Sequence, residues 1–427
     1  MREDFLHFIW KYGKLRSGEL TTSGGEAVQV LEVGTHNMLA GPDFFNSKIV
    51  IGGQLWAGTV EIHIKSSDWY AHHHEMDPNY NNVILHVVWE DDIAVFRKDN
   101  SQIPTLALGQ YISSGILDAY RKLFQKKENK FINCGKGIRN VTPLVWGNWL
   151  ERLYFERLER KWNLIGQLLE ESQNDWERVF FAMMAKNFGL RINGELFLDI
   201  AKRLDFNMVR KIQGNTLQLE SVFFGMAGLL SEEIQGDDYY NGLKKEYGYL
   251  RKKFRITDGP EQKPQFFMLR PANFPTIRLS QLANLYVKER NLFDKVMAAR
   301  NLGDLYKVLD VSASPYWDTH FTFGKVSGTG RRKLTTKFMD LVVINTVLPM
   351  KFGYSQYIGS DVDEEIIDII SLIKPESNSV MAKFQELGVP FSSALESQAL
   401  LQLYNEYCIR NKCLQCAVGH GLLSGKA

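Results

Sequence analysis

The chain has 427 residues, of which 44% are hydrophobic and 12% aromatic, and its formal net charge is +2 at pH 7. This composition is typical of a globular protein that buries large cores, with room for two or three domains and no need of disulfide staples. A net charge this small does not by itself indicate a nucleic-acid partner. The N-terminal segment MREDFLHFIWKYGK has early acidic residues and no long apolar region, so we expect a cytoplasmic protein with no signal peptide, membrane span or membrane partner.

The first 135 residues are predicted to mix helix and strand. A short N-terminal helix is followed by strands near 26–33, 43–51, 56–65, 83–90 and 93–97, with a helical turn around 68–77. The apolar run of the fourth strand is typical of a buried strand, in which His86 is expected as a hydrogen-bonded core residue.

From about residue 142 the pattern becomes helical. A stripe of large side chains recurs every three or four residues, with charges on the other faces. Its members are Leu150, Tyr154, Leu158, Trp162, Ile165 and Leu169. The sequence therefore predicts an α+β (α/β) protein with an α/β domain over residues 1–135 and a mainly helical domain over residues 136–427, which carries a C-terminal cysteine cluster.

Residues 40–69, AGPDFFNSKIVIGGQLWAGTVEIHIKSSDW, predict a hairpin that brings two carboxylates together. Gly52-Gly53 marks its turn, and strict alternation puts Glu61, His63 and Lys65 on the face opposite Val60, Ile62 and Ile64. A turn centred there pairs position 43 near position 62. A one-residue slip at Gly58, where a bulge is plausible, would set Asp43 opposite Glu61 or His63.

Asp43 and Glu61 are the candidate ligands of a magnesium or manganese ion, because hard divalent cations take carboxylate oxygens. His63 or Lys65 would then assist the attacking water. A solvent-facing strand with ordinary charges is the alternative explanation of the pattern E-x-H-x-K. The position of Asp43, after Pro42 at a strand start and convergent with Glu61, favours the site.

The order of motifs resembles an uncharacterised bacterial family, domain of unknown function 2851. The motifs are GPDF, a hairpin, VEIH, SSDW, a histidine cluster, PNYNNV, ILHVVW and RPANFPTIR, followed by the C-terminal cysteines. The resemblance covers most of the chain and implies no function.

Pro42-Asp43 followed by an acidic strand residue is also similar to the PD-(D/E)xK nuclease superfamily. That resemblance implies a mixed sheet with flanking helices, in which Asp43 and Glu61 hold magnesium for cleavage of nucleic acid. A lysine two positions after the glutamate orients the water in that superfamily, whereas this chain has His63 there. Because of this departure, a nuclease-like scaffold that binds nucleic acid or protein without catalysis is the alternative.

Six of the nine histidines lie between positions 36 and 86. Within SSDWYAHHHEMDPNY, the side chains of Asp68, His72, His74 and Asp77 are candidate ligands of a transition metal. Together with His63 they suggest a third function, a hydrolase with a histidine-bound metal. In the alternative explanation of this segment, its histidines lie on the surface and Asp68 caps a short helix.

Two basic runs are candidates for contact with phosphates. Residues 121–139 hold seven Lys or Arg against one acidic residue, and residues 244–255 hold six against one. Solvated helix faces would produce the same runs. RPANFPTIR is predicted to be a rigid extended loop flanked by Arg270 and Arg278, and FGKVSGTGRRK to be a basic loop with Arg331 and Arg332. These four arginines are the candidate nucleic-acid ligands, although Arg270 and Arg278 would serve equally in pairs with acidic residues.

The cysteines suggest a second metal site. Three of the four, Cys408, Cys413 and Cys416, follow the spacing C-x4-C-x2-C, and the fourth is Cys134. In a cytoplasmic protein this spacing indicates a metal rather than disulfides. The four would hold an iron–sulfur cluster or zinc, with His420 as a possible replacement for zinc. Some RecB-type nucleases are similar, although their remote cysteine precedes the hairpin; small reduced cysteines in a core are the alternative.

Overall fold

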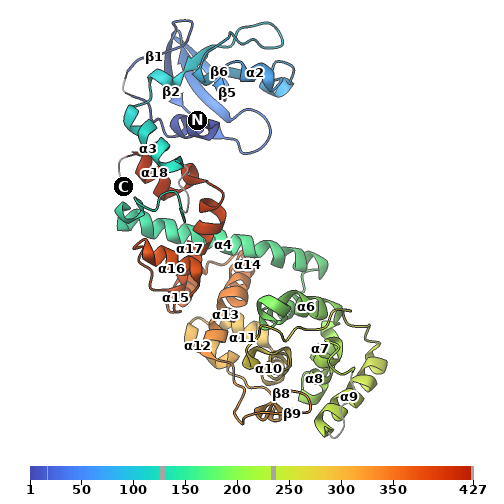
Figure 1. Ribbon diagram of the computed structural model, residues 1–427. Coiled ribbons are helices and arrows are strands. Elements are labelled where there is room, and N and C mark those ends of the chain that lie inside the picture. Colours follow the sequence, from blue (N-terminus) through green and yellow to red (C-terminus); the bar gives the residue numbers. More distant parts are fainter. Residues whose placement is uncertain (17, 126–129, 232–236, 425–427) are drawn as a thin grey trace. The chain divides into compact units, whose positions relative to one another are not determined.

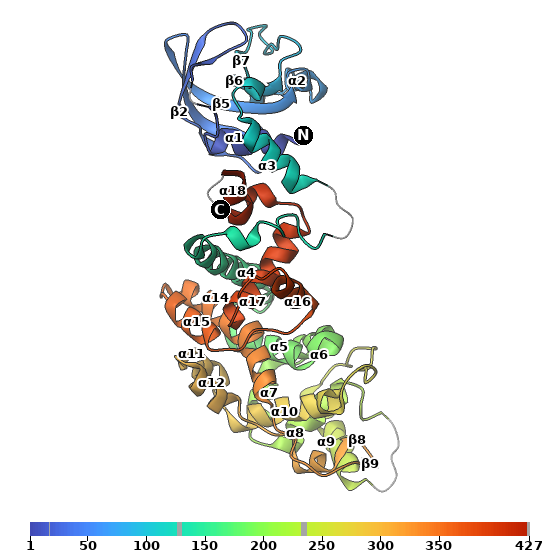
Figure 2. The ribbon, with the colours of Figure 1, turned by 60° about the vertical axis from the view of Figure 1, so that its left-hand side comes forward.

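The computed structural model describes residues 1–16, 18–125, 130–231 and 237–424. It is a mixed α+β protein with an N-terminal sheet and a mainly helical remainder (Figures 1 and 2), as the sequence predicts. The chain forms two compact units. The first comprises Met1–Trp149, Ala382–Val389 and Leu403–Ala427, and the second comprises Leu150–Met381 and Pro390–Gln402. The domain boundary between residues 135 and 136 stays a prediction, because compact units need not fold independently.

A seven-stranded mixed sheet forms the framework of the first unit. Its strands are β1 (Leu20–Thr21), β2 (Ala27–Glu32), β3 (Thr35–His36), β4 (Phe44–Ile51), β5 (Gln54–Lys65), β6 (Val83–Glu90) and β7 (Thr105–Ala107). The order is β1-β2-β4-β5-β6-β7, with β3 paired to β4. Pairs from β1 to β5 are antiparallel, whereas β5–β6 and β6–β7 are parallel.

The hairpin β4–β5 has the predicted turn and a displaced register. Ile51 pairs with Gln54 around Gly52-Gly53, whereas Phe44 pairs with Val60. The extra residue lies in β4 and not at Gly58, because the register shifts between Phe44 and Ser47, where Asn46 has a φ of +57°. The result is the slipped alignment that sets Asp43 beside Glu61.

Gly58 has a different role from the predicted bulge. An added Cβ would lie 2.6 Å from the carbonyl oxygen of Asn82 and 2.5 Å from the Ile84 side chain. The missing side chain therefore permits the close approach of the segment that leads into β6.

Helix α1 (Glu3–Lys11) packs on one face of the sheet. Its Phe5, Leu6 and Ile9 are fully buried against strand residues such as Val60 and Ile62. α3 (Ser114–Phe124) and C-terminal residues add Tyr120, Leu123, Cys413, Leu414 and Leu423 to this core. Because Val60 and Ile62 face this core, the alternation turns Glu61 and His63 toward the other face.

A smaller cluster lies on that other face, around α2 (Asp68–Ala71). Trp69 of α2 packs with Tyr80, Val83, Val95 and Ile103. The short helix follows β5 at once, so the histidines at its end return over the strand that carries Glu61 and His63.

Most of the predicted strands are confirmed, and two segments differ. Strands β2, β4, β5 and β6 lie where the sequence places them, but residues 93–97 form only an isolated bridge between Phe96 and Gln102. β7 was not expected: it is three residues long and pairs in parallel with β6. A strand that short has too few residues to show a period.

The remaining helices lie mainly in the second unit. They are α4 (Pro143–Glu171), α5 (Trp176–Phe188), α6 (Leu190–Arg203), α7 (Phe206–Ile212), α8 (Thr216–Met226), α9 (Asp238–Phe254), α10 (Pro275–Lys288), α11 (Leu292–Ala298), α12 (Leu302–Leu309), α13 (Thr336–Val342), α14 (Leu348–Ile358), α15 (Asp363–Ser371), α16 (Ser379–Glu386), α17 (Ala394–Gln402) and α18 (Ala417–Ser424). The predicted stripe of α4 is buried at Leu150, Tyr154, Leu158, Ile165 and Leu169.

RPANFPTIR is not the extended loop predicted from its prolines. Pro271–Asn273 form a 3-10 turn, and Pro275 is the first residue of α10. Proline suits the first helical position because its missing N–H has no partner to lose there. Nearby, β8 (His320–Thr322) and β9 (Lys325–Val326) form a small hairpin whose second strand lies within FGKVSGTGRRK, which is therefore only partly a loop. Among the described residues, none of the helices is both long enough and apolar enough to cross a membrane.

Candidate metal centre

Asp43 and Glu61 lie side by side across the β4–β5 hairpin. The backbone N–H of Asp43 donates to Oε2 of Glu61 at 3.2 Å, and the N–H of Ile62 donates to Oδ2 of Asp43 at 2.9 Å. Each carboxylate is thus held by the backbone of the other's strand. Glu61 is 5% exposed, whereas the Asp43 side chain is 21% exposed. The pair therefore reaches from the interior to the surface.

His63 lies beside Glu61 and joins two further histidines. Its Nε2 is 3.4 Å from Oε1 of Glu61 and 3.1 Å from Nδ1 of His72, and its Nδ1 is 2.9 Å from Nε2 of His86. His63 is 1% exposed and His86 is fully buried. His86 is therefore the hydrogen-bonded core histidine that the sequence predicts.

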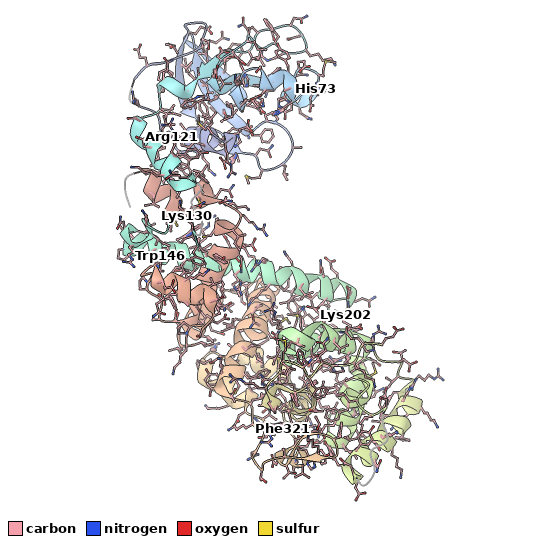
Figure 3. The ribbon with its side chains drawn as sticks, in the orientation of Figure 1. His73, Arg121, Lys130, Trp146, Lys202 and Phe321 are labelled. Carbon is pink, nitrogen blue, oxygen red and sulfur yellow. The ribbon has the colours of Figure 1, made fainter. Side chains whose placement is uncertain are left out.

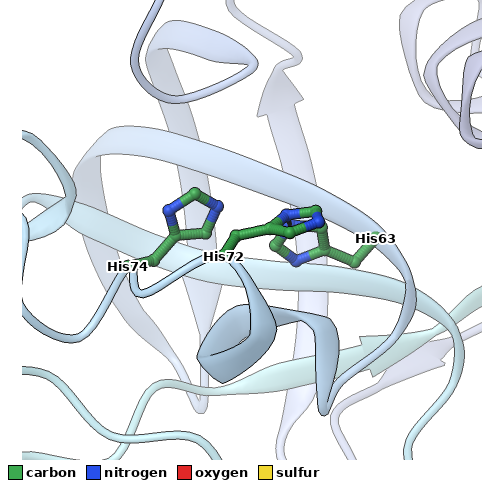
Figure 4. Close-up of side chains that lie close together, drawn as sticks. All are labelled: His63, His72 and His74. Atoms are coloured by element: carbon green, nitrogen blue, oxygen red, sulfur yellow. Dashed lines mark hydrogen bonds between the residues drawn. The ribbon is translucent and has the colours of Figure 1, made fainter.

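His74 completes a group of three imidazoles. The ring nitrogens of His63, His72 and His74 lie within 4.8 Å of one another (Figure 4), and Nε2 of His74 is 3.3 Å from Oε1 of Glu61. The ring of His74 stacks on Tyr80 with centroids 3.8 Å apart. His73, labelled in Figure 3, is exposed and lies between two histidines of this group in the sequence. Its φ of +60° reflects the tight turn that brings both neighbours onto β5.

Helix α1 contributes two residues that the sequence reasoning missed. Nε2 of His7 is 3.3 Å from Oδ2 of Asp43, and Glu3 lies one helical turn earlier, where it interacts electrostatically with Asp43. The pattern that could have found them is the pair of polar residues four apart in a helix whose neighbours Phe5, Phe8 and Ile9 are buried.

Burial governs the electrostatics of this group, because it disfavours the charged forms of the carboxyl groups and of the imidazoles. Burial and the neighbouring Asp43 raise the pKa of Glu61 to about 9 and the pKa of Glu3 to about 7. Burial opposes protonation of His7, but the hydrogen bond and charge of Asp43 raise its pKa overall. Burial and the adjacent imidazoles lower the pKa of His63 to about 2, and burial lowers the pKa of His74. Neutral imidazoles next to buried carboxyl groups are ready to accept a cation.

The other predicted residues of this segment lie outside the group. The Nζ of Lys65 is 3.8 Å from Glu90 and 3.9 Å from Asp92, and its side chain is 48% exposed. Asp68 accepts from the N–H of Lys65, and Asp77 accepts from the N–H of Asn79. Neither aspartate joins the three imidazoles, because both carboxylates cap local backbone.

The four candidate nucleic-acid arginines have different surroundings. Arg270 and Arg331 are exposed. Arg278 is only 5% exposed, with its guanidinium 3.5 Å from the ring centre of Phe338 and a hydrogen bond from Nη1 to Gln281. A buried guanidinium cannot reach a phosphate on the surface, which corrects the expectation for Arg278.

Arg332 is half-buried over the Phe321 ring and fastens the basic loop. Its Nε donates to the carbonyl of Trp317 and its Nη2 to the carbonyl of Gly328. Arg332 therefore holds protein backbone, and Arg270 and Arg331 stay the exposed candidates of the four.

The described lysines and arginines of the two basic runs are exposed, except Lys130, which is partly buried. Arg121 lies on α3 and Lys130 follows it (Figure 3), whereas residues 126–129 of that run lie outside the described residues. All six Lys or Arg of residues 244–255 are exposed, five of them on α9. Arg251 pairs with Asp258. A contact with phosphates stays a prediction for both runs.

The four cysteines gather around one cavity in the first unit. Cys134, Cys408, Cys413 and Cys416 line it together with Asn133, Leu403, Tyr407, Val418 and Gly419, and all four cysteines are free of disulfides. His420 is not part of this lining; its ring packs against Phe8 and Tyr12. The structure thus brings the remote cysteine to the C-terminal three, as the metal hypothesis requires.

The cysteine cavity has two further features, an unusual backbone geometry and hydrogen-bond donors that point at its sulfurs. Leu403–Cys408 form a π-helix, a rare geometry that is frequent at functional sites. The side chain of Asn133 donates to the sulfur of Cys413 at 3.5 Å, and the N–H groups of Val418 and Gly419 donate to Cys416. Burial raises the pKa of all four thiols, that of Cys416 to about 11. Buried thiols with N–H donors directed at two of the sulfurs suit metal-bound thiolates.

Comparison with known proteins places the chain in a family without a known activity. Residues 3–379 match the model of a family described as "Protein of unknown function (DUF2851)". No curated protein and no solved structure matches the chain.

Proposed function

The chain belongs to the DUF2851 family of proteins of unknown function, and we propose that it is a metal-dependent hydrolase of phosphodiesters. The observation that carries the proposal is the convergence of Asp43 and Glu61 with three imidazoles at one end of the β4–β5 hairpin. A divalent cation such as magnesium or manganese, bound by the two carboxylates, would lower the pKa of a bound water and supply hydroxide next to the phosphorus.

The residues around this pair support such a role. Asp43 is accessible to solvent and His72 is exposed, so a substrate can reach the group from that side. Glu61 is buried and held by the N–H of Asp43, so its position is fixed before a substrate arrives. The similarity to the PD-(D/E)xK nucleases, in which an Asp and a Glu on adjacent strands hold the metal, favours nucleic acid as the phosphodiester. The exposed lysines and arginines of α9, together with Arg270 and Arg331, are candidates for binding its backbone.

Asp43→Asn is the first test of this proposal. The variant keeps an oxygen to accept from the N–H of Ile62 but removes a charged ligand, so we expect hydrolysis to fall by about 100-fold or more. The assay uses single- and double-stranded DNA and RNA and the simple diester bis(4-nitrophenyl) phosphate, each with magnesium or manganese.

The control for Asp43→Asn is Glu32→Gln. Glu32 is an exposed carboxylate on β2 that pairs with Lys48 of β4, so its loss leaves the metal-binding pair intact. Equal activity of wild type and Asp43→Asn on every substrate would exclude the proposed site. Lys65→Ala is tested separately. If its rate of hydrolysis falls as far as that of Asp43→Asn, Lys65 orients the water as lysine does in the nucleases.

A scaffold without catalysis is the second candidate, and the position of Lys65 favours it. The only lysine on this face of β5 is turned to Glu90 and Asp92, away from the carboxylate pair. Binding of nucleic acid without cleavage in any metal, measured in the same experiments, would select the scaffold.

We also propose that the four cysteines hold an iron–sulfur cluster. The four thiols line one cavity, and N–H groups donate to the sulfurs of Cys413 and Cys416. The similarity to RecB-type nucleases, which join one remote cysteine to three near the C-terminus, favours iron over zinc.

Metal analysis of protein purified without oxygen tests the cluster. We expect iron and acid-labile sulfide in equal amounts, with a broad visible absorption near 400 nm. Cys134→Ser should lose most of the iron, whereas His420→Phe, which keeps an aromatic ring against Phe8 and Tyr12, should retain it. Zinc in place of iron, or neither metal in freshly purified wild type, would refute the cluster.

A further inference from the structure

We infer that His63, His72 and His74 bind a transition-metal ion of the zinc or iron(II) type, with Glu61 as the adjoining carboxylate. This inference deepens the proposed function, because it names the cofactor of the same site. It also differs from what the similarity to the nucleases implies, since those enzymes hold magnesium with carboxylates alone.

The donor atoms form a continuous chain of short separations. Nδ1 of His72 is 3.1 Å from Nε2 of His63, which is 3.4 Å from Oε1 of Glu61, which is 3.3 Å from Nε2 of His74. Ligands of a tetrahedral ion with bonds of ~2.0–2.1 Å are separated by roughly 3.3 Å. The separations in the chain therefore match the distance between neighbouring ligands of one ion.

The hydrogen bonds of His63 decide which of its nitrogens is free to bind an ion. A neutral imidazole has one N–H and one acceptor nitrogen; both nitrogens of His63 have close nitrogen neighbours, and Nε2 also faces Glu61. If Nδ1 of His63 donates to Nε2 of His86, the lone pair of its Nε2 points into the group formed with His72 and Glu61. A cation there would be bound by that lone pair, and His86 would be the residue that orients the ligand.

The chemistry of the donors selects the class of metal. Imidazole nitrogen suits zinc, iron, nickel or copper, whereas magnesium prefers oxygen ligands and keeps its waters. A divalent ion would also compensate the charge of the buried Glu61 carboxylate. Because His72 is exposed, the ion can enter from solvent and keep a position for water or substrate.

His72→Ala and His73→Asn form a matched pair of variants. The two histidines are adjacent and both exposed, but only His72 contributes to the triad. Asparagine tolerates the positive φ of residue 73. We expect metal analysis to find one zinc or iron fewer per chain in His72→Ala than in wild type, whereas His73→Asn should equal wild type. Cobalt(II) added to metal-free protein should give the strong visible bands of tetrahedral cobalt, and His72→Ala should lose these bands.

The cysteines can also bind metal, so the readout must separate the two sites. Cobalt bound by thiolates gives charge-transfer absorption in the near ultraviolet, which imidazole and carboxylate ligands do not give. Thiolate-bound cobalt also absorbs in the visible, so His72→Ala should lose only the visible bands of the histidine site, obtained as the difference between the wild-type and variant spectra, while the near-ultraviolet thiolate absorption stays unchanged. Equal metal content and equal cobalt spectra in wild type and His72→Ala would overturn the inference.

Failure of the inference and failure of the proposed function give different results. Hydrolysis that depends on Asp43, together with equal metal content in wild type and His72→Ala, would overturn the histidine site and leave the hydrolase. Metal loss in His72→Ala, with no hydrolysis by wild type on any substrate, would establish the ion and refute the hydrolase.

Discussion

Glu61→Gln is expected to abolish hydrolysis, with a loss of at least about 1,000-fold, or roughly 4 kcal/mol of transition-state stabilisation. Glu61 is the carboxylate common to both parts of the site, because Oε2 accepts from the N–H of Asp43 while Oε1 faces His63 and His74. Gln has the same shape and can retain the hydrogen bond from Asp43, but its amide is a poor metal ligand. The measurement is the initial rate with saturating metal, relative to wild type.

The same variant should fold as well as wild type. Burial and Asp43 raise the pKa of Glu61 to about 9, so the carboxyl group is protonated at neutral pH when no cation is bound, and glutamine resembles that form. Thermal unfolding without metal should therefore be nearly unchanged, whereas added manganese, which thiolates bind poorly, should raise the Tm of wild type and not that of Glu61→Gln. Glu90→Gln, an exposed carboxylate at the end of β6, is the matched control. Full activity in Glu61→Gln would contradict the site as described.

Gly419→Ala should have the largest effect on stability. Within a helix, alanine is normally preferred to glycine by about 1 kcal/mol. In α18 the sign is reversed, because a Cβ on residue 419 would lie 1.9 Å from the carbonyl oxygen of Cys413. Backbone must move to relieve that contact, so we expect the free energy of unfolding to fall by about 1–3 kcal/mol. Since Gly419 and Cys413 both line the cysteine cavity, bound iron should decrease as well.

Gly147→Ala is the control for this substitution. Gly147 lies in α4, and a Cβ added to it has no atom within 4 Å. Only the helix preference of alanine over glycine acts there, so the free energy of unfolding should rise slightly. Chemical denaturation monitored by circular dichroism compares the two variants. An equally stable Gly419→Ala would mean that the contact with Cys413 is not maintained in solution.

The hairpin could be predicted because the residues that specify it lie close together in the sequence. Gly52-Gly53 sets the turn, and the alternation of β5 assigns Glu61 and His63 to one face, so one extra residue in either strand brings Asp43 opposite one of these two side chains; the extra residue in β4 selects Glu61. The predicted position of the bulge was wrong. Asn46 has a positive φ, and an asparagine does not indicate that conformation by its identity alone as a glycine does.

The rest of the centre depends on packing between elements. Glu3 and His7 reach Asp43 only because α1 packs on the sheet, and His72 and His74 reach His63 only because α2 turns back over β5. Arg278 illustrates the opposite error: nothing adjacent to it shows that the ring of Phe338, 60 residues later, will cover its guanidinium. Contacts of this kind between distant elements cannot be inferred from the periodicity or the spacing of residues in the sequence.

Cys134 was assigned to the three C-terminal cysteines by a chemical argument and not by a pattern in the sequence. Cys134 and Cys408 are separated by more than 270 residues, and no periodicity connects them. The requirement of a metal for a fourth thiolate and the similarity to RecB-type nucleases were the reasons to group them, and the structure places all four on one cavity.

The composition of the first unit has a consequence for how the protein is made. Cys413, Leu414 and Leu423 belong to the same hydrophobic core as α1, yet they are synthesised after the whole second unit. At translation rates of roughly 5–20 residues per second, the sheet waits about 10–60 s for these residues. During that interval the apolar surface that they later cover is open on the nascent chain, where a chaperone can bind it. All residues of the second unit, by contrast, have been synthesised once the ribosome reaches residue 402.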